Sequence, residues 1–357
     1  MNRRNFLGMG AAALAGMTLV PSLTSCAGGE KAAGPVRAQR DGDKPNSNFG
    51  GVHMGTITYS WRDMPGGLDN LIKYCKEANV SNLELMGTDL EGALGAPASP
   101  MMGLIQGAMA RLTPEERGGL MGRPGGFMSI LNADEQKQIA DYNEAIANFR
   151  NNLDFAKVEE VRQRFESEGI DIHIVKTEPG ANSTDEQIDY AFKLAKAMGV
   201  KAVTAEMSLE AAQRVAPFAE KFDMYYVLHN HMQYATPEFA AGPDQVLAVS
   251  PNIMLNFDFG HYFGSTGKNP CDFIEKYHDR IFSMHTKDKT GPNAATPNEN
   301  QVWGQGETPL ADVLKLVQSK YPEIYCDCEL EYAVAPWSNS VKEVGTCMKY
   351  ARQILEL

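Results

Sequence analysis

The sequence predicts an α/β protein built as a (β/α)8 TIM barrel, and three observations carry this prediction. Strand-like runs alternate with helix-like runs from about Gly50 to the C-terminus. Eight such pairs occur, at a spacing typical of parallel strands joined by helical crossovers. Eight units in a segment of this length fit the size of such a barrel. An open doubly wound sheet is the alternative, but no G-x-G-x-x-G turn follows the first strand.

The expected strands are short runs rich in β-branched and aliphatic residues. They cover 51–60, 80–87, 170–178, 200–208, 225–231, 252–261, 280–288 and 323–332. The expected helices have apolar residues at intervals of three and four. They cover 68–79, 155–169, 184–199, 209–222, 238–249, 271–279, 309–319 and 338–355.

Two connections at the C-terminal ends of strands are long. The first is an insertion over about 88–134, rich in Gly and Met, which precedes a helical run through 134–151. Flexible apolar Met side chains suit an adaptable lid, and an ordinary surface insertion is the alternative. The second, 289–307, carries Trp303 and ends in Gly304-Gln305-Gly306-Glu307. Both leave the face of a barrel on which active sites lie.

The first 26 residues are expected to be a targeting segment rather than part of the fold. Arg3 and Arg4 precede a run of small apolar residues, and Cys26 follows Leu-Thr-Ser as in a bacterial lipobox. We expect twin-arginine export, cleavage before Cys26 and a lipid anchor, which would place the protein in the periplasm at the cell envelope. An uncleaved anchor or a plain secretory signal is the alternative. Residues 27–49 read as a flexible tether and 50–357 as the barrel.

Composition narrows the class of partner. The 357 residues include 45 acidic and 33 basic ones, for a formal charge of −12. This balance disfavours nucleic acid as a partner, and we expect membrane contact only through the lipid on Cys26. The five cysteines other than Cys26 show no disulfide framework.

The last four expected strands each deliver an imidazole or a carboxylate near their C-terminal end. These residues are His229, Asp258, His285 and Glu329. Strand residues two apart project the same way, so His231, Lys287 and Glu331 accompany them. Burying such groups is costly unless they are paired or bind a cation. Because divalent metals take imidazole and carboxylate together, we predict one divalent ion (Mn, Mg, Co or Zn) held by these four residues.

The same region resembles a known family. The similar stretches are LHNHMQYATPE (228–238), NFDFGHYFG (256–264), the run from RIFSMHTKD (280–288) to WGQGETPLADVL (303–314), and CELEY (328–332). They resemble the xylose isomerase-like superfamily and, more narrowly, its sugar phosphate isomerase/epimerase group. The resemblance implies a TIM barrel, a divalent metal, and metal ligands at Asp258, His285 and Glu329.

One departure from that family affects the expected chemistry. The family's strand-five ligand is commonly Glu followed two residues later by His, whereas this chain has His229 and His231. An epimerase with two Glu residues uses the strand-five carboxylate as one of its opposed acid and base groups. Glu206, at the end of strand four, is the expected replacement as ligand or base. Pairing of Glu206 with a nearby lysine, or a cap on the following helix, is the alternative.

The resemblance implies removal of a proton beside a carbonyl, with the ion stabilising the enediolate. Glu206 or His231 is expected to move the proton, and Lys287 to bind an oxyanion or a hydroxyl. A salt bridge from Lys287 to Asp258 or to a strand-eight acid is the alternative. The resemblance implies a small-molecule carbohydrate as the substrate partner. The residues expected to contact it are His261, Trp303 and Glu331.

Three other functions compete with a sugar isomerase or epimerase. An exported enzyme meets free sugars and glycosides more than sugar phosphates, so a 3-keto-glycoside lyase or hydratase of the same fold is a close alternative. A non-catalytic sugar-binding lipoprotein could stack sugars on Tyr59, Trp61 and Trp303, but it would need no metal cluster. A multi-zinc apurinic endonuclease is disfavoured by the negative charge and by too few ligands.

Overall fold

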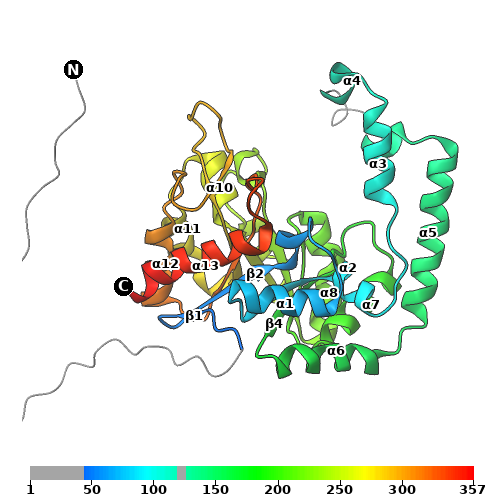
Figure 1. Ribbon diagram of the computed structural model, residues 1–357, viewed down its shortest axis with the longest axis horizontal. Helices are drawn as coiled ribbons and strands as arrows, with labels where there is room; N and C mark the ends of the chain where they lie inside the picture. The colour runs from blue at the N-terminus through cyan, green and yellow to red at the C-terminus, as the bar shows by residue number, and fades with distance from the viewer. Residues whose placement is uncertain (1–43, 119–125) are drawn as a thin grey trace, which may run out of the picture. The chain divides into compact units, whose positions relative to one another are not determined.

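The computed structural model describes residues 44–118 and 126–357. Eight parallel strands close into a barrel because the first, β2, pairs with both β3 and β11. The expected (β/α)8 architecture is therefore confirmed (Figure 1). The barrel strands are β2 (Val52–Ile57), β3 (Asn82–Met86), β4 (Asp171–Lys176), β5 (Ala202–Glu206), β6 (Tyr225–His229), β7 (Ile253–Asp258), β8 (Ile281–Thr286) and β11 (Tyr325–Cys328).

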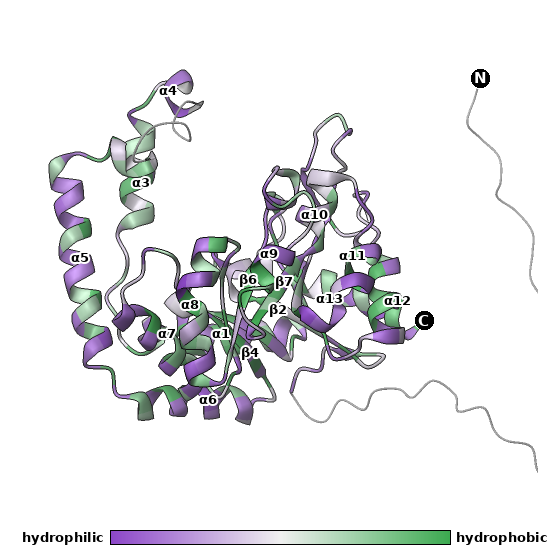
Figure 2. Ribbon diagram, turned by 180° about the vertical axis from the view of Figure 1, so that it is seen from behind, coloured by the Kyte–Doolittle hydropathy of each residue, from purple (hydrophilic) through white to green (hydrophobic). Residues whose placement is uncertain are grey.

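Helices surround these strands and bury the main hydrophobic core against them. Figure 2 shows the hydrophobic strands β6 and β7 inside, with helices of mixed polarity around them. The helices of the barrel are α1 (Leu68–Ala78), α6 (Phe155–Ser167), α7 (Asp185–Ala197), α8 (Leu209–Phe222), α9 (Asp244–Leu247), α10 (Phe259–Thr266), α11 (Pro270–Tyr277), α12 (Leu310–Lys320) and α13 (Ser340–Glu356). Among the described residues, no helix is both long and apolar enough to cross a bilayer.

Packed structure begins a few residues before the expected start at Gly50. The short strand β1 (Asn48–Phe49) pairs antiparallel with β2, and Ser47 is fully buried with its hydroxyl 2.5 Å from the Met54 carbonyl oxygen. These contacts place the last residues of the expected 27–49 tether in the fold. The expected signal segment and most of the tether lie outside the described residues.

The expectation of a long loop over 88–134 is wrong. Most of the described part of this segment is helical, because Met, Leu, Ala and Gln favour a helix strongly enough to tolerate two glycines in α3. The connection from β3 to α6 contains α2 (Gly87–Ala93), α3 (Met101–Ala110), α4 (Pro114–Gly118), a short 3-10 helix (Gly126–Ile130) and α5 (Ala133–Asn151). Helices α3 and α5 lie side by side in both views and share a small apolar cluster of their own (Figures 1 and 2).

Two other expected boundaries shift for local reasons. The expected helix over 238–249 is reduced to α9, because Gly242 has a φ of 122° and Pro243 follows it. The strand expected to run to His261 ends at Asp258, whose side chain accepts the backbone N–H of His261 and begins α10. Helix α10 thus starts at the barrel mouth.

Buried polar side chains inside the barrel leave no room for a side chain at Gly55 on β2. His173 Nε2 lies 2.7 Å from Asp327 Oδ2, and both side chains are buried. Gly55 lies beside this pair. A Cβ atom at position 55 would stand 2.2 Å from Asp327 Oδ1 and 2.7 Å from the Asn82 carbonyl oxygen.

We therefore expect Gly55→Ala to destabilise the barrel. Overpacking costs about 1–3 kcal/mol, and for a domain of this size a cost of 1 kcal/mol lowers Tm by roughly 2–4 °C. Thermal unfolding followed by circular dichroism measures the effect. Gly66→Ala is the matched control, because nothing lies within 4 Å of an added Cβ there. Equal Tm values for the two variants would contradict this account of the interior.

Candidate metal centre

The four residues expected to bind metal meet at the C-terminal mouth of the barrel. His229 and Asp258 end β6 and β7, His285 lies near the end of β8, and Glu329 follows β11. His229 Nε2 lies 3.6 Å from Asp258 Oδ2 and 3.8 Å from Glu329 Oε2. One potential ligand atom from each of the four lies within 4.8 Å of all the others, and all four side chains are buried.

This arrangement fits a divalent cation. His229 Nε2 is a buried atom without a hydrogen-bond partner in the described part of the chain, and Asp258 Oδ2 is met only by the Lys287 ammonium at 3.0 Å and by His229 Nε2 at 3.6 Å among the described residues. Burying such atoms is costly unless something neutralises them. Two atoms bound to one ion at roughly 2.0–2.2 Å each stand at most about 4.4 Å apart. Ligands on opposite sides of an ion would therefore need to move together by a few tenths of an ångström, and ligands at tetrahedral angles, which stand about 3.4 Å apart, by up to about 1.4 Å.

The electric field at the mouth also favours positive charge. Burial alone would lower the pKa of His285, but the charges of Glu329 and Glu84 outweigh burial and raise that pKa well above its ordinary value. Lys287 is the cation shared by the carboxylates of Asp258, Glu329 and Glu331, at distances of 3.0, 2.6 and 2.7 Å. One ammonium does not balance three carboxylates, so the mouth retains an excess of negative charge.

Glu84 on β3 supports the cluster from below, and it was not among the expected site residues. Its Oε2 lies 3.0 Å from His285 Nε2 and accepts a hydrogen bond from Asn256 Nδ2 at 2.8 Å, and its side chain is completely buried. His285 Nδ1 lies 2.8 Å from Glu329 Oε2. Both ring nitrogens of His285 thus face carboxylates, and Nδ1 is the nitrogen that would bind an ion shared with Glu329 while Glu84 orients the ring through Nε2. The sequence signal was a single acid inside the apolar strand NLELM.

Asp258 uses its two oxygens for different purposes. Oδ1 accepts the backbone N–H of His261 at 2.7 Å and caps α10, whereas Oδ2 faces His229 and Lys287. The Asp258 backbone N–H in turn donates to Asn230 Oδ1 at 3.0 Å. Burial alone would raise the pKa of Asp258, but nearby Lys287 and the histidines hold it below its usual range. Asp258 is therefore ionised and fixed on both sides.

Glu206 and His231 form a second group beside the first. Glu206 lies next to His229 in the β5–β6 register, and its carboxylate is 3.3 Å from His229 Nδ1 and 3.0 Å from His231 Nδ1. Lys176 on β4 donates to the same carboxylate at 3.2 Å. The lysine pairing considered for Glu206 is thus present in the structure. Glu206, His229 and His231 could also hold an ion, but Lys176 already supplies positive charge there, so the buried set suits an ion better.

The three expected substrate contacts have different fates. His261 Nε2 lies 3.4 Å from Glu331 Oε2, and the His261 ring stands 4.9 Å from that of His231, so both His261 and Glu331 border the mouth. Trp303 is not brought to this cluster. Its indole is buried and meets the Tyr350 ring of α13 edge-on at 6.1 Å. The placement of Trp303 therefore gives no support to the predicted stacking on a sugar.

The glycine-containing motif after Trp303 folds around one carboxylate. Asp288 accepts backbone N–H groups from Gly304, Gly306 and Thr308 at 2.8, 2.9 and 3.2 Å. A side chain at position 306 would clash, because a Cβ atom would lie 2.2 Å from Asp288 Oδ1. Asp288 thereby fixes the loop that leads into α12, and the motif is explained by loop geometry.

Comparison with known proteins agrees with this architecture. The chain is similar to the probable 3-DHS dehydratase AsbF from Bacillus anthracis, at 14% identity over 84% of this chain and 97% of that one, with a TM-score of 0.54. A xylose isomerase domain protein from Alicyclobacillus acidocaldarius is 13% identical over 85% of this chain and 100% of that one, with a TM-score of 0.53. A putative uncharacterized protein from Parabacteroides distasonis is 18% identical over 85% of this chain and 99% of that one, with a TM-score of 0.52. No curated protein matches. At these identities the solved structures show a shared fold.

The family comparison is more specific. The model of the family described as xylose isomerase-like TIM barrel matches residues 136–351, which is more than half of the chain. The matched segment includes all four residues of the buried cluster. The chain belongs to the xylose isomerase-like TIM barrel family.

Proposed function

We propose that the protein is a divalent-metal-dependent sugar isomerase or epimerase that removes a proton from carbon beside a carbonyl. The observation that carries this proposal is the buried cluster of two imidazoles and two carboxylates from four strands, in which His229 Nε2 has no hydrogen-bond partner among the described residues. His229, Asp258, His285 and Glu329 would hold the ion. When bound, the ion supplies Lewis-acid stabilisation of negative charge on the substrate oxygens.

The reaction needs a base that can accept the carbon-bound proton, and His231 suits this role. Its Nδ1 lies against Glu206, so its Nε2 is the nitrogen free to take a proton, and its side chain is 47% exposed at the mouth. Glu206 is less suited because His229, His231 and Lys176 surround its two oxygens. Although burial opposes ionisation of Glu206, these neighbours hold its pKa well below the usual range. We assign proton transfer to His231 and positioning of the imidazole to Glu206.

The proton transfers then balance without an external oxidant or reductant. His231 takes the proton, the C–H electron pair forms the carbon–carbon double bond of an enediolate, and the carbonyl oxygen gains the negative charge. In isomerisation, the proton returns to the neighbouring carbon while the hydroxyl proton moves to the former carbonyl oxygen, so the two oxygens exchange roles. In epimerisation, water delivers a proton to the opposite face of the same carbon, and His231 releases its own proton to solvent. Lys287 forms the salt bridges considered as its alternative role, because its ammonium lies 3.0, 2.6 and 2.7 Å from the carboxylates of Asp258, Glu329 and Glu331. In the proposed reaction its positive charge would stabilise the oxygen that becomes charged.

A second candidate is β-elimination from a keto-glycoside, which one feature favours. Strand β6 carries His229 where a carboxylate would be needed for two opposed acid and base groups of the same kind. Elimination needs a single base. After proton removal, the C–O bond β to the carbonyl breaks, the electron pair leaves with that oxygen, and the leaving oxygen takes a proton. If the protein is exported and lipid-anchored at Cys26 as predicted, it would meet glycosides rather than sugar phosphates.

Incubation of the metal-loaded protein in deuterated water tests the proposed function and separates the two outcomes. Free aldoses, free ketoses and 3-keto-glycosides are the substrates. We expect deuterium to enter at one carbon beside the carbonyl, detected by NMR. Release of an aglycone would identify elimination. A complete lack of exchange across all three substrate classes would contradict proton abstraction.

Removing one ligand should remove the metal without unfolding the barrel. We expect Asp258→Asn and His285→Ala to lose bound metal in elemental analysis and to lose activity, because ligands at the C-terminal mouth serve mainly function. Circular dichroism checks that both variants remain folded. His278→Ala, which alters a ring stacked on Tyr321, is the control imidazole. Wild-type metal content in both site variants would exclude them as ligands.

Glu84, which contacts His285 from β3, should affect how tightly the metal binds rather than which residues bind it. Glu84→Gln keeps the shape of the side chain but removes the charge that orients His285, so we expect metal affinity to fall by roughly 10–100-fold. Calorimetric titration of the metal-free protein measures this directly. Thr204→Val is the control, because Thr204 is buried and its hydroxyl donates to the Val227 carbonyl oxygen rather than to a residue of the cluster. Unchanged affinity in Glu84→Gln would show that Glu84 is only structural.

The two residues beside the cluster should separate in the exchange assay. We expect His231→Ala to lower the rate of deuterium incorporation by roughly 10²–10⁴-fold while metal binding survives. Glu206→Gln should lower the rate less, because the imidazole remains. If Glu206→Gln abolishes exchange and His231→Ala does not, the two roles are reversed. If neither variant changes the rate, another group carries the proton.

A further inference from the structure

A polar cleft lies beside the barrel mouth, between α2 and α7. Its volume is about 260 Å³, which is below the roughly 300–1,000 Å³ of sites for drug-sized ligands. Its walls come from the end of β3 and α2, the segment after β4, the first turns of α7 and the last turn of α5. Thr88 and Gln187 bring a hydroxyl and an amide to the lining, and the Gln187 amide oxygen also accepts the backbone N–H of Thr184 at 2.9 Å. The space suits one small polar ring.

The charges of this cleft, which we name the α2/α7 cleft, are all neutralised within the described residues. Arg150 donates to Glu91 at 2.6 and 3.0 Å, and the Tyr190 hydroxyl donates to the same carboxylate at 2.8 Å. Lys176 lies 3.2 Å from Glu206 and 3.5 Å from Glu178. A phosphate or carboxylate would have to displace one of these carboxylates. The lining therefore favours a neutral ligand with many hydroxyl groups.

The α2/α7 cleft adjoins the candidate metal centre through one ion pair. Lys176 lines the cleft, and its partner Glu206 contacts His229 and His231. Two further features lie at this wall. Glu178 adopts a left-handed backbone conformation with a φ of 55°, which is unfavourable for a residue with a side chain, and the buried Thr177 hydroxyl has no hydrogen-bond partner in the described chain. Strain and an unpaired hydroxyl at one wall are typical of a binding site.

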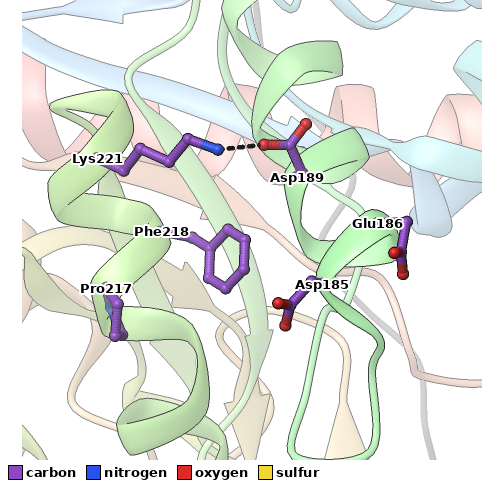
Figure 3. A pocket seen from close by; sticks show the side chains of 6 residues that line it. All are labelled: Asp185, Glu186, Asp189, Pro217, Phe218 and Lys221. Carbon is purple, nitrogen blue, oxygen red and sulfur yellow. Dashed lines mark hydrogen bonds and ion pairs between the residues drawn. The ribbon is translucent and has the colours of Figure 1, made fainter.

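A groove on the other side of α7 provides a contrast. It lies between α7 and α8 and has a volume of about 450 Å³ (Figure 3). Phe218 stands in this groove, and Lys221 pairs with Asp189 across it at 2.6 Å. Asp185 is 73% exposed and pairs with Arg214. These are solvated surface charges on the outside of the barrel, and nothing links them to the buried cluster.

We propose that the α2/α7 cleft is a subsite for the second ring of a neutral glycoside whose first ring reacts at the metal centre. The inference rests on the proposed function and specifies its substrate class as a disaccharide or a glycoside with a ring-shaped aglycone. The Lys176–Glu206 pair forms the wall shared by the two rings. A sugar phosphate is not the expected substrate, because the cations of the cleft are already paired.

Binding of neutral disaccharides tests this proposal. The probes are trehalose, maltose and cellobiose, compared with glucose and glucose 6-phosphate by calorimetry or saturation-transfer NMR on the purified protein. We expect at least one disaccharide to bind roughly tenfold or more tightly than glucose, with no gain from the phosphate. Thr88→Trp, which fills the cleft, should remove this tenfold preference, and Gln187→Leu should reduce it. Phe218→Trp, in the α7/α8 groove, is the control of similar bulk.

The proposal would be overturned if glucose and all three disaccharides bound equally, or if none of them bound. It would also be overturned if glucose 6-phosphate bound more tightly than every disaccharide, or if a disaccharide preference survived Thr88→Trp. The exchange assay separates this failure from failure of the proposed function. Exchange on monosaccharides without a disaccharide preference removes only the subsite. A cleft-dependent preference without exchange on any substrate leaves the subsite and removes the proposed reaction.

Discussion

The mouth of this barrel holds more carboxylates than cations, and the arrangement of its strand ends follows from that imbalance. Asp258, Glu329 and Glu331 surround a single ammonium on Lys287, and Glu84 adds a fourth negative charge beneath His285. In a buried setting, charges of one sign destabilise the fold unless they are shared or neutralised. The histidines are the groups that absorb the excess, which is why three strands present imidazoles or lysines toward the acids. The same imbalance makes the mouth receptive to a dication.

The departure from the family pattern on β6 looks milder in three dimensions than in the sequence. Glu206 is the register partner of His229 on the adjacent strand, so a carboxylate still lies beside this position, about one strand spacing of 4.8 Å away. The substitution moves negative charge from the centre of the mouth toward Lys176. It thereby joins two regions, the buried cluster and the α2/α7 cleft, by one ion pair.

The sequence predicts the barrel well because each strand carries its own local signal and the parallel topology aligns the C-terminal ends. This is also why His229, Asp258, His285 and Glu329 could be grouped before any coordinates existed. Glu84 was not predicted because the candidate site residues were found on strands with polar residues two positions apart. The strand NLELM carries a single acid among apolar residues, so it lacks that pattern. The contact of Trp303 could not be predicted, because an aromatic residue in a loop can face either the mouth or the helices, and Tyr350, which its ring meets, lies 47 positions away in the sequence. Contacts of that range depend on tertiary packing and leave no local pattern.

The two oxygens of Asp258 belong to one rigid planar group, and one of them begins a helix. The first turn of α10 therefore fixes the position of the other oxygen, because any rotation of the carboxylate that moves Oδ2 also strains the hydrogen bond from the N–H of His261 to Oδ1. The Asp258 side chain thus has two roles, because it caps the start of α10 and belongs to the buried cluster. Neither a longer acid nor an amide could fill both roles. The position is constrained by architecture as much as by chemistry. Recruitment of this barrel to another reaction would more easily rebuild the surrounding loops than alter this corner.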